Sequence, residues 1–280
     1  MKKSFNFSAE ALDQLARADA ARALAEDVGA GDLTAALIDP AAQARAQLLA
    51  RENAVLCGSA WVQAAFRQLD PQARLVWHVK DGEPCAANQV VFEVHGQARA
   101  LLTAERTALN FLQLLSAVAT KTAAYVAVVA GTRAKIVDTR KTLPGLRLAQ
   151  KYAVRSGGGT NHRVGLYDAV LIKENHIAAA GGIRQVLQHA AQIAEQADFV
   201  EIEVETLEQL AEALSAGARM VLLDNMDLAT LREAVRLNAG RAILEISGGV
   251  TLEGLRALAE TGVDRISIGT LTKDVQAIDF

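Results

Sequence analysis

The chain has 280 residues, of which 51% are hydrophobic, 20 are glycine and 4 are proline. This length suits one β/α barrel or two smaller domains, and the composition is that of a folded protein rather than a disordered or collagen-like chain. Lysine and arginine number 29 against 32 acidic residues, which gives a net charge of −3. Because nucleic acids and anionic membranes attract proteins with a basic face, this balance predicts neither as a partner.

Two features of the sequence predict a cytoplasmic protein. The cysteines, Cys57 and Cys85, have neither the spacing of a redox pair nor histidines close by, which suits reduced thiols. The first 30 residues contain no apolar run of the kind that a secretion signal requires. The most apolar stretch, residues 111–131, is interrupted by polar side chains, so we expect a buried helix there and not a membrane span.

The first part of the chain indicates a small layer of helices and strands. Residues 8–27 form an alanine-rich amphipathic pattern that begins at Ser8 and ends at the glycine turn 29–31, as a capped helix does. Helical patterns also cover residues 60–69 and 101–130. Strand patterns predict strands at residues 46–56, 74–79 and 89–94.

From residue 131 onward, short apolar or β-branched runs alternate with helical segments. This alternation predicts parallel strands with crossover helices, because a tight turn cannot join a parallel pair. In a barrel the polar groups that follow each strand meet at one mouth, whereas an open doubly wound sheet brings together only those near its switch point. The barrel therefore explains more of the pattern, and it is expected to be incomplete. The predicted strands are residues 134–137, 169–172, 199–204, 220–223, 242–246 and 265–268.

Residues 133–173 carry a concentration of positive charge, with nine lysines and arginines against two aspartates. Three of these cations follow predicted strands, and two further polar residues follow a glycine-rich loop over residues 156–161. Arginine binds carboxylate and phosphate oxygens through paired hydrogen bonds, and lysine adds a point charge. The segment therefore predicts a small polyanionic ligand held by Arg140, Lys141, His162, Arg163 and Lys173.

Other polar residues of this segment are less specific. Arg147, Lys151 and Arg155 recur every four residues, which indicates one face of a helix. A run of charge on a helix is usually a solvated face, so we expect these three side chains to be exposed. A histidine in a polar loop, such as His162 or His176, is more often structural than catalytic.

Two glycine-containing loops follow the last two predicted strands. Such loops expose backbone N–H groups next to a helix N-terminus, where a phosphate monoester can bind. We therefore expect phosphate binding at two groups of residues, Ser247, Gly248 and Gly249, and Ser267, Ile268 and Gly269.

Carboxylates end two of the predicted strands, at Glu203 and Asp224. They indicate a Mg²⁺ site, hydrogen bonds to ribose hydroxyls, or ion pairs with the neighbouring lysines. Glu201 and Glu205 share the alternation of Glu203, so the spacing leaves open which of the three side chains faces a ligand.

Long stretches of the sequence resemble one known family. Residues 138–176, DTRKTLPGLRLAQKYAVRSGGGTNHRVGLYDAVLIKENH, strongly resemble the core of the quinolinate phosphoribosyltransferases, the decarboxylating nicotinate-nucleotide pyrophosphorylases. Five shorter motifs look like the same family and occur in its order: EDVGAGDLT (26–34), ERTALNFLQLLS (105–116), VEIEVETLEQL (200–210), VLLDNM (221–226) and LEISGGV (244–250). The resemblance covers nearly the whole chain.

This resemblance implies an α/β fold in which an incomplete parallel β/α barrel is joined to an N-terminal α/β sandwich domain. The implied domains are residues 1–115 and 116–280, with an extreme C-terminus that can return to the first domain. The implied assembly is a homodimer in which each active site receives Arg106 from the neighbouring subunit. The resemblance is also compatible with a higher oligomer.

The implied activity is that of a pentosyltransferase. It transfers the phosphoribosyl group from 5-phosphoribosyl 1-pyrophosphate to quinolinate with decarboxylation, giving nicotinate mononucleotide, pyrophosphate and CO₂ in NAD biosynthesis. The implied catalytic residues are Lys141, Lys173, Glu203 and Asp224, of which the two carboxylates also hold Mg²⁺. The implied substrate-binding residues are these four together with Arg106, Thr139, Arg140, His162, Arg163, Ser247, Gly248, Gly249, Ser267, Ile268 and Gly269. The choice of Glu203 over Glu201 rests on the resemblance.

Three other functions fit parts of the pattern. Lys173, at a strand end of a phosphate-binding barrel, fits an aldolase that forms a Schiff base, although nearby acids favour a charged lysine. The same cations fit an anion-binding module without catalysis. Within the phosphoribosyltransferases, nicotinate could replace quinolinate as the pyridine substrate.

Overall fold

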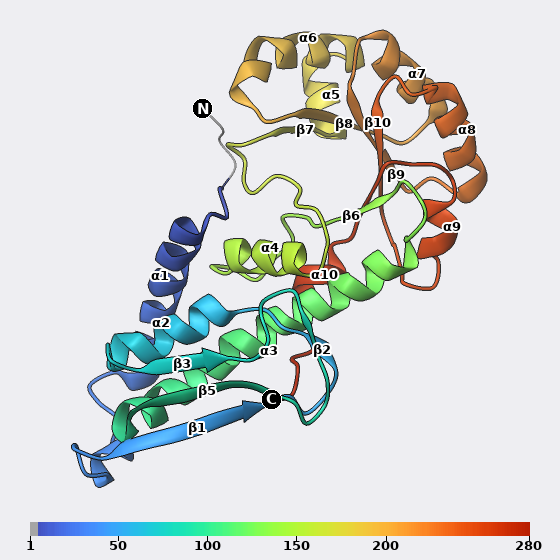
Figure 1. Cartoon of the computed structure of the whole chain (residues 1–280). Coiled ribbons are helices and arrows are strands. Elements are labelled where there is room, and N and C mark those ends of the chain that lie inside the picture. The colour runs from blue at the N-terminus through green and yellow to red at the C-terminus, as the bar shows by residue number, and fades with distance from the viewer. Residues whose placement is uncertain (1–4) are drawn as a thin grey trace. The chain divides into compact units, whose positions relative to one another are not determined.

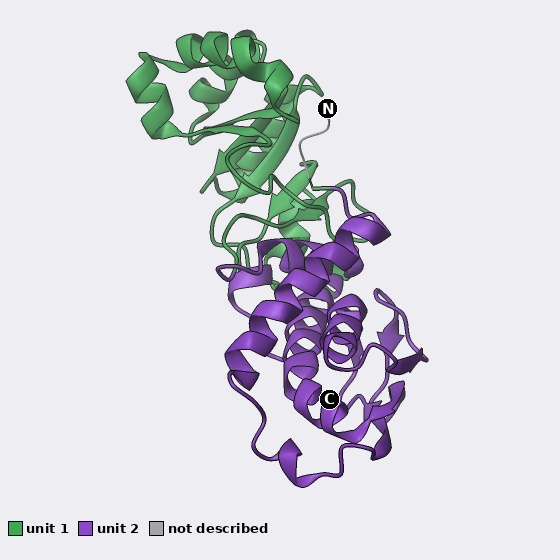
Figure 2. Cartoon of the chain, turned by 90° about the vertical axis from the view of Figure 1, so that its left-hand side faces the viewer, with its two compact units in different colours: residues 1–5, 124–142, 159–270 green, residues 6–123, 143–158, 271–280 purple. Residues whose placement is uncertain are grey.

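The computed structural model describes residues 5–280, and this part of the chain divides into two compact units (Figure 2). One unit, purple in Figure 2, contains residues 6–123, 143–158 and 271–280. The other, green, contains residues 124–142 and 159–270 together with Phe5. The units therefore interleave along the chain, and the expected domain boundary at residue 115 lies inside a long helix.

The purple unit combines helices with small antiparallel sheets (Figure 1). Strands β1, β5 and β3 pair in that order, and β2 pairs separately with β4. The strands are β1 (Gln43–Leu49), β2 (Ala54–Val55), β3 (Arg74–Trp77), β4 (Pro84–Cys85) and β5 (Val90–Gln97). The helices are α1 (Ala9–Val28), α2 (Ser59–Leu69), α3 (Ala98–Val128), which continues into the green unit, α4 (Arg147–Ser156) and the 3₁₀ turn Ala35–Leu37.

Two expectations for this unit are corrected. The single strand predicted at residues 46–56 is two strands, β1 and β2, in different sheets, because exposed polar residues 51–53 interrupt it. Lys151 does not lie on a solvated face, since its side chain is fully buried. By contrast, helix α1 begins as predicted, with the Ser8 hydroxyl accepting a hydrogen bond from the Ala11 N–H.

Helix α3 forms part of the hydrophobic core of the purple unit. Among the helices of residues 5–280, it alone is long and apolar enough to satisfy the length and composition of a membrane span. Half of the relevant window is buried within the structure, and Leu112, Leu115 and Val118 are fully inaccessible core residues. The expectation of a buried helix is therefore confirmed.

The green unit is built on parallel strands, which the described residues arrange in the order β6-β11-β10-β9-β8-β7. The order follows the chain, except that β6 pairs with β11, as it does when a sheet curls towards closure. Strands β6 and β7 do not pair with each other within the described chain, so the barrel is incomplete as predicted. The strands are β6 (Lys135–Val137), β7 (Val170–Ile172), β8 (Val200–Val204), β9 (Met220–Asp224), β10 (Ile243–Ser247) and β11 (Arg265–Ser267).

Helices connect these strands and lie around their outer side (Figure 1). Consecutive helices contact one another from α5 to α8. Each crossover carries the chain back so that the next strand runs parallel to the last. The helices are α5 (Glu174–Ala180), α6 (Ile183–Ile193) with the 3₁₀ turn Ala194–Gln196, α7 (Leu207–Ser215), α8 (Leu228–Asn238), α9 (Leu255–Ala259) and α10 (Thr270–Lys273).

Side-chain alternation along β8 separates the two faces of the sheet. Ile202 and Val204 are buried apolar residues of one face, whereas Glu201 and Glu203 belong to the other. On that second face Glu245 of β10 lies next to Arg265 of β11 in the strand register. The inner face of this barrel therefore carries charged side chains among its strands.

Candidate functional site

The polar residues predicted at strand ends gather at one end of the green unit. All six described strands of this sheet run in the same direction, so their carboxyl ends share one edge. The residues found at these ends are Asp138 after β6, Lys173 after β7, Glu203 in β8, Asp224 in β9, Ser247 in β10 and Ser267 in β11. The site predicted from the sequence thus has a common location in the fold.

Arg140 follows β6, Arg163 lies in the segment between α4 and β7, and the charge of Arg140 acts on Arg163. Both side chains are partly buried, and an Arg163 Nη1–H donates to the Ala169 carbonyl at 3.4 Å. Burial lowers the pKa of Arg163, and the positive charge of Arg140 lowers it further. Two cations that interact in this way create a positive region that favours a ligand with more than one negative charge.

Lys173 forms an ion pair with Glu203. Its Nζ lies 3.2 Å from Oε2 of Glu203, and the lysine side chain is 49% exposed against 16% for the glutamate. The pair therefore sits where the barrel opens to solvent. His176 has a structural position, because its Nδ1 accepts the Lys173 backbone N–H at 3.0 Å at the start of α5.

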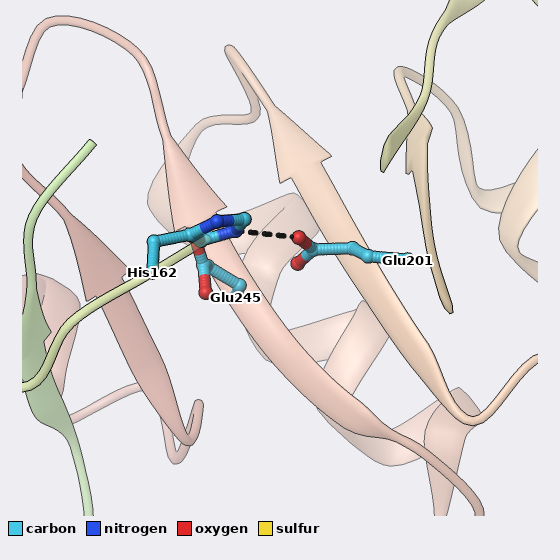
Figure 3. Close-up of side chains that lie close together, drawn as sticks. All are labelled: His162, Glu201 and Glu245. Atoms are coloured by element: carbon cyan, nitrogen blue, oxygen red, sulfur yellow. Dashed lines mark hydrogen bonds and ion pairs between the residues drawn. The ribbon is translucent and has the colours of Figure 1, made fainter. Parts of the chain in front are cut away.

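A buried network lies beneath these residues (Figure 3). The Nε2 atom of His162 is 2.8 Å from Oε2 of Glu201 and 3.6 Å from Oε1 of Glu245. Arg265 donates through Nε to Oε2 of Glu245 at 2.6 Å, and the Ser267 hydroxyl donates to the other oxygen. Burial raises the pKa of Glu201 to about 7 and also raises the pKa of Glu245.

The sequence analysis missed Glu245 and Arg265. The signal was present, because each is two residues before a serine that was assigned to the site and therefore shares its face of the strand. Of the three alternatives Glu201, Glu203 and Glu205, the first two lie in β8 and Glu205 follows it. The structure places Glu201 in the buried network and Glu203 beside Lys173, so both side chains face inward at different depths.

The phosphate-type loops have different neighbours. At Gly248 the backbone has φ +102°, and a Cβ atom there would collide with the Asn225 side chain, which donates to Asp224 at 2.8 Å. A Cβ atom at Gly269 would lie 2.9 Å from Cδ of Lys141, so these two predicted residues lie together.

In the loop at residues 267–269, two polar groups form hydrogen bonds within the protein. The Ser267 hydroxyl donates to Glu245, and the Ile268 N–H donates to the Val137 carbonyl at 2.9 Å. The Ile268 side chain is buried. Of this loop, Gly269 is therefore the better placed to meet a ligand through its main chain.

Glu203 and Asp224 are the carboxylates that could hold a cation at the mouth. They belong to adjacent strands, β8 and β9, and both are only partly buried. Mg²⁺ is usually held by one or two protein carboxylates, with water and substrate phosphates completing its coordination. The donor set fits that pattern. Within residues 5–280, three side chains that could together ligate a metal ion lie elsewhere, at His162, Glu201 and Glu245.

Two further predicted residues have clear positions. Thr139 accepts the Lys141 N–H through its hydroxyl at 3.0 Å, which shapes the turn after β6. Arg106 is an exposed residue of helix α3 in the other unit.

The fold and these clusters define a class of protein, a β/α barrel with charged side chains at the carboxyl ends of its strands. The C-terminal domain of the quinolinate phosphoribosyl transferases matches residues 118–280, and the N-terminal domain matches residues 32–116. The chain belongs to this family.

Individual relatives agree with the family assignment. A Bacillus subtilis protein named probable nicotinate-nucleotide pyrophosphorylase (carboxylating) is 44% identical, over 91% of this chain and 88% of its own length. A decarboxylating quinolinate phosphoribosyltransferase of Nicotiana glauca is 40% identical, over 92% and 79%. The solved nicotinate-nucleotide pyrophosphorylase of Francisella tularensis has a TM-score of 0.92 and 43% identity, with 95% of each chain covered.

We predict that Asp138→Asn destabilises the fold by about 1–3 kcal/mol in free energy of unfolding. The buried Asp138 carboxylate accepts the His162 backbone N–H at 2.8 Å and the Asn161 side-chain amide at 2.7 Å. An amide at this position would turn one acceptor into a donor that faces another donor. Urea denaturation measures the change, with the exposed Asp198→Asn as control, and equal stability of the two variants would contradict this role.

Proposed function

We propose that this chain transfers the phosphoribosyl group of 5-phosphoribosyl 1-pyrophosphate to quinolinate and releases CO₂, pyrophosphate and nicotinate mononucleotide. Membership of the family supports the reaction. The observation that carries the proposal is the gathering of Lys173, Glu203 and Asp224 at the carboxyl ends of the parallel strands, where Lys173 pairs with Glu203 at 3.2 Å. Arg140 follows β6 at the same edge, and its charge acts on Arg163. A pyridine with two adjacent carboxylates is a ligand that such a pair would select.

The first task of the site is to bring two anions together. Quinolinate carries two negative charges and phosphoribosyl pyrophosphate carries several, so their approach in water is opposed by Coulomb repulsion. Arg140 and Arg163 bind the carboxylates, and Lys173 adds a third positive charge beside Glu203. Orienting the ring nitrogen towards the anomeric carbon contributes up to ~7–11 kcal/mol in favourable cases.

The second task is to stabilise charge that develops as pyrophosphate leaves. The sugar becomes oxocarbenium-like, and the carboxylate of Glu203 stabilises its positive charge. Lys141, which lies beside Gly269, neutralises the departing pyrophosphate. The loops at residues 247–249 and 267–269 hold the phosphate groups of the sugar substrate.

Mg²⁺ belongs to this proposal as the cofactor. Glu203 and Asp224 would hold it together with substrate oxygens, and it would supply additional positive charge at the pyrophosphate. Decarboxylation needs no further group from the protein. Once the ring nitrogen is ribosylated it is positively charged, and this charge stabilises the carbanion left when the adjacent carboxylate departs as CO₂. A proton from water then completes the C–H bond at that carbon.

The proposal includes a homodimer in the cytoplasm. Arg106, exposed on α3, enters the active site of the neighbouring subunit and adds a cation to the substrate pocket. A higher oligomer is compatible with this arrangement.

The direct test is product formation from quinolinate, phosphoribosyl pyrophosphate and Mg²⁺. We expect CO₂ and nicotinate mononucleotide in equal amounts, with no product when Mg²⁺ is removed by a chelator. Binding of phosphoribosyl pyrophosphate without turnover would instead favour an anion-binding module. Trapping of a carbonyl substrate on Lys173 by borohydride would favour an aldolase.

We expect Arg140→Ala and Arg163→Ala each to raise the KM for quinolinate roughly 10- to 100-fold, or to abolish turnover. Each substitution removes a charge-assisted contact to a carboxylate, so the KM for phosphoribosyl pyrophosphate should change less. The control is Arg184→Ala, which removes an exposed cation from α6. Quinolinate kinetics that match the control would refute the assignment.

Shared sites predict complementation between two inactive variants. Arg106→Ala removes the donated cation, and Lys173→Ala removes a cation of the receiving site. A mixture of the two chains forms some dimers with one intact site, so activity should exceed the sum of the separate variants. Activity that stays at the sum, after subunit exchange has been verified, would show that the site is completed within one chain.

A further inference from the structure

The side chain of His162 has both ring nitrogens engaged. Its Nδ1 accepts the backbone N–H of Arg163 at 2.8 Å, and its Nε2 lies 2.8 Å from Oε2 of Glu201. The side chain is 7% exposed. A histidine that meets a substrate as a cation needs a ring N–H directed at that substrate, and both nitrogens of this ring are directed at protein groups.

The partner of Nδ1 also determines the protonation state. A backbone N–H can only donate, so Nδ1 must present its lone pair and carries no proton. The ring proton therefore lies on Nε2, where it is donated to Glu201. This is neutral imidazole of a single tautomer, and it differs from the substrate-binding role that the family resemblance implies for His162.

The main chain around Arg163 is held by three acceptor side chains in succession. Asp138 accepts the N–H of His162 at 2.8 Å, and His162 accepts the N–H of Arg163. Asp168, itself buried, accepts the next two N–H groups, from Val164 at 2.6 Å and Gly165 at 2.8 Å. Four consecutive backbone donors are thus fixed by side chains, and Arg163 lies within this run.

The ring of His162 is fixed in turn by the interior of the barrel (Figure 3). Glu201 holds Nε2 from β8, and Glu245 lies close on β10. Glu245 is neutralised by Arg265 at 2.6 Å, and the charge of Arg163 acts on Glu201. Glu245 therefore has a cation in contact, Arg265, whereas Glu201 is held through one oxygen by the His162 ring.

We propose that His162 is a positioning residue that fixes the backbone of Arg163, and thereby the guanidinium that selects the second carboxylate of the pyridine substrate. The inference rests on the proposed function, in which Arg163 binds quinolinate. In this inference His162 does not contact the substrate but contacts the main chain of a residue that does. Its effect on the reaction passes through Arg163 and concerns quinolinate, not phosphoribosyl pyrophosphate.

Two substitutions separate the roles of the ring nitrogens. In His162→Asn the amide oxygen can occupy the place of Nδ1 and accept the Arg163 N–H. In His162→Gln the longer amide reaches the place of Nε2 but leaves that N–H without its acceptor. We expect the Kd for quinolinate to stay within about threefold in the Asn variant and to rise roughly tenfold or more in the Gln variant, with an unchanged Kd for phosphoribosyl pyrophosphate.

A double-mutant cycle tests whether His162 acts through Arg163. In an Arg163→Ala background, His162→Gln should cause no further loss of quinolinate affinity, because the group that it positions is gone. Independent, multiplying losses would overturn the inference and indicate a direct contact with substrate. If Arg163→Ala alone leaves quinolinate affinity unchanged, the proposed role of Arg163 in binding quinolinate is wrong. That outcome differs from one in which both single substitutions weaken binding and their effects multiply.

A spectroscopic measurement on the unmodified enzyme applies even if a variant fails to fold. With ¹⁵N-labelled histidine, NMR of the quinolinate complex should show one protonated and one unprotonated ring nitrogen for His162. Two protonated nitrogens in the complex would identify a substrate-facing imidazolium and would overturn the inference.

Discussion

The structure depends on holding like charges together at the carboxyl ends of parallel strands. Arg140 and Arg163 lie close enough that the charge of one lowers the pKa of the other. The carboxylates of Asp168 and Glu201 act in the opposite direction and raise the pKa of Arg163, so anionic side chains of the protein offset part of this repulsion. In the proposed function, a ligand with two negative charges adds further favourable interactions with these cations.

The barrel interior supplies the means of fixing them. Buried carboxylates, which alone would be costly in an apolar core, here meet Arg265, His162 and backbone N–H groups. The resulting contacts join strands that are far apart in the sequence, such as β8 and β10, to the loop that carries Arg163. In the inference drawn above, the charged core therefore contributes to the site through Arg163.

The sequence predicted the parallel strands, the incomplete barrel and the strand-end positions of Lys173, Glu203 and Asp224, because these follow from local alternation. It did not predict the division of β1 from β2, although the polar residues 51–53 mark the break. It also did not predict the burial of Lys151, which depends on contacts from other elements. The pairing of His162 with Glu201 joins positions 39 residues apart, and no local pattern records it. The family resemblance implied roles for individual residues. The hydrogen-bond partners of His162 are set by the tertiary structure and could not be read from the sequence.

The central claim is that the clustered arginines select a pyridine diacid. Calorimetric titration of the unmodified enzyme with quinolinate and with nicotinate, which lacks the second carboxylate, tests it most directly. We expect quinolinate to bind roughly tenfold or more tightly, with an advantage that shrinks as salt is added. Equal affinities for the two acids at low salt would contradict the account.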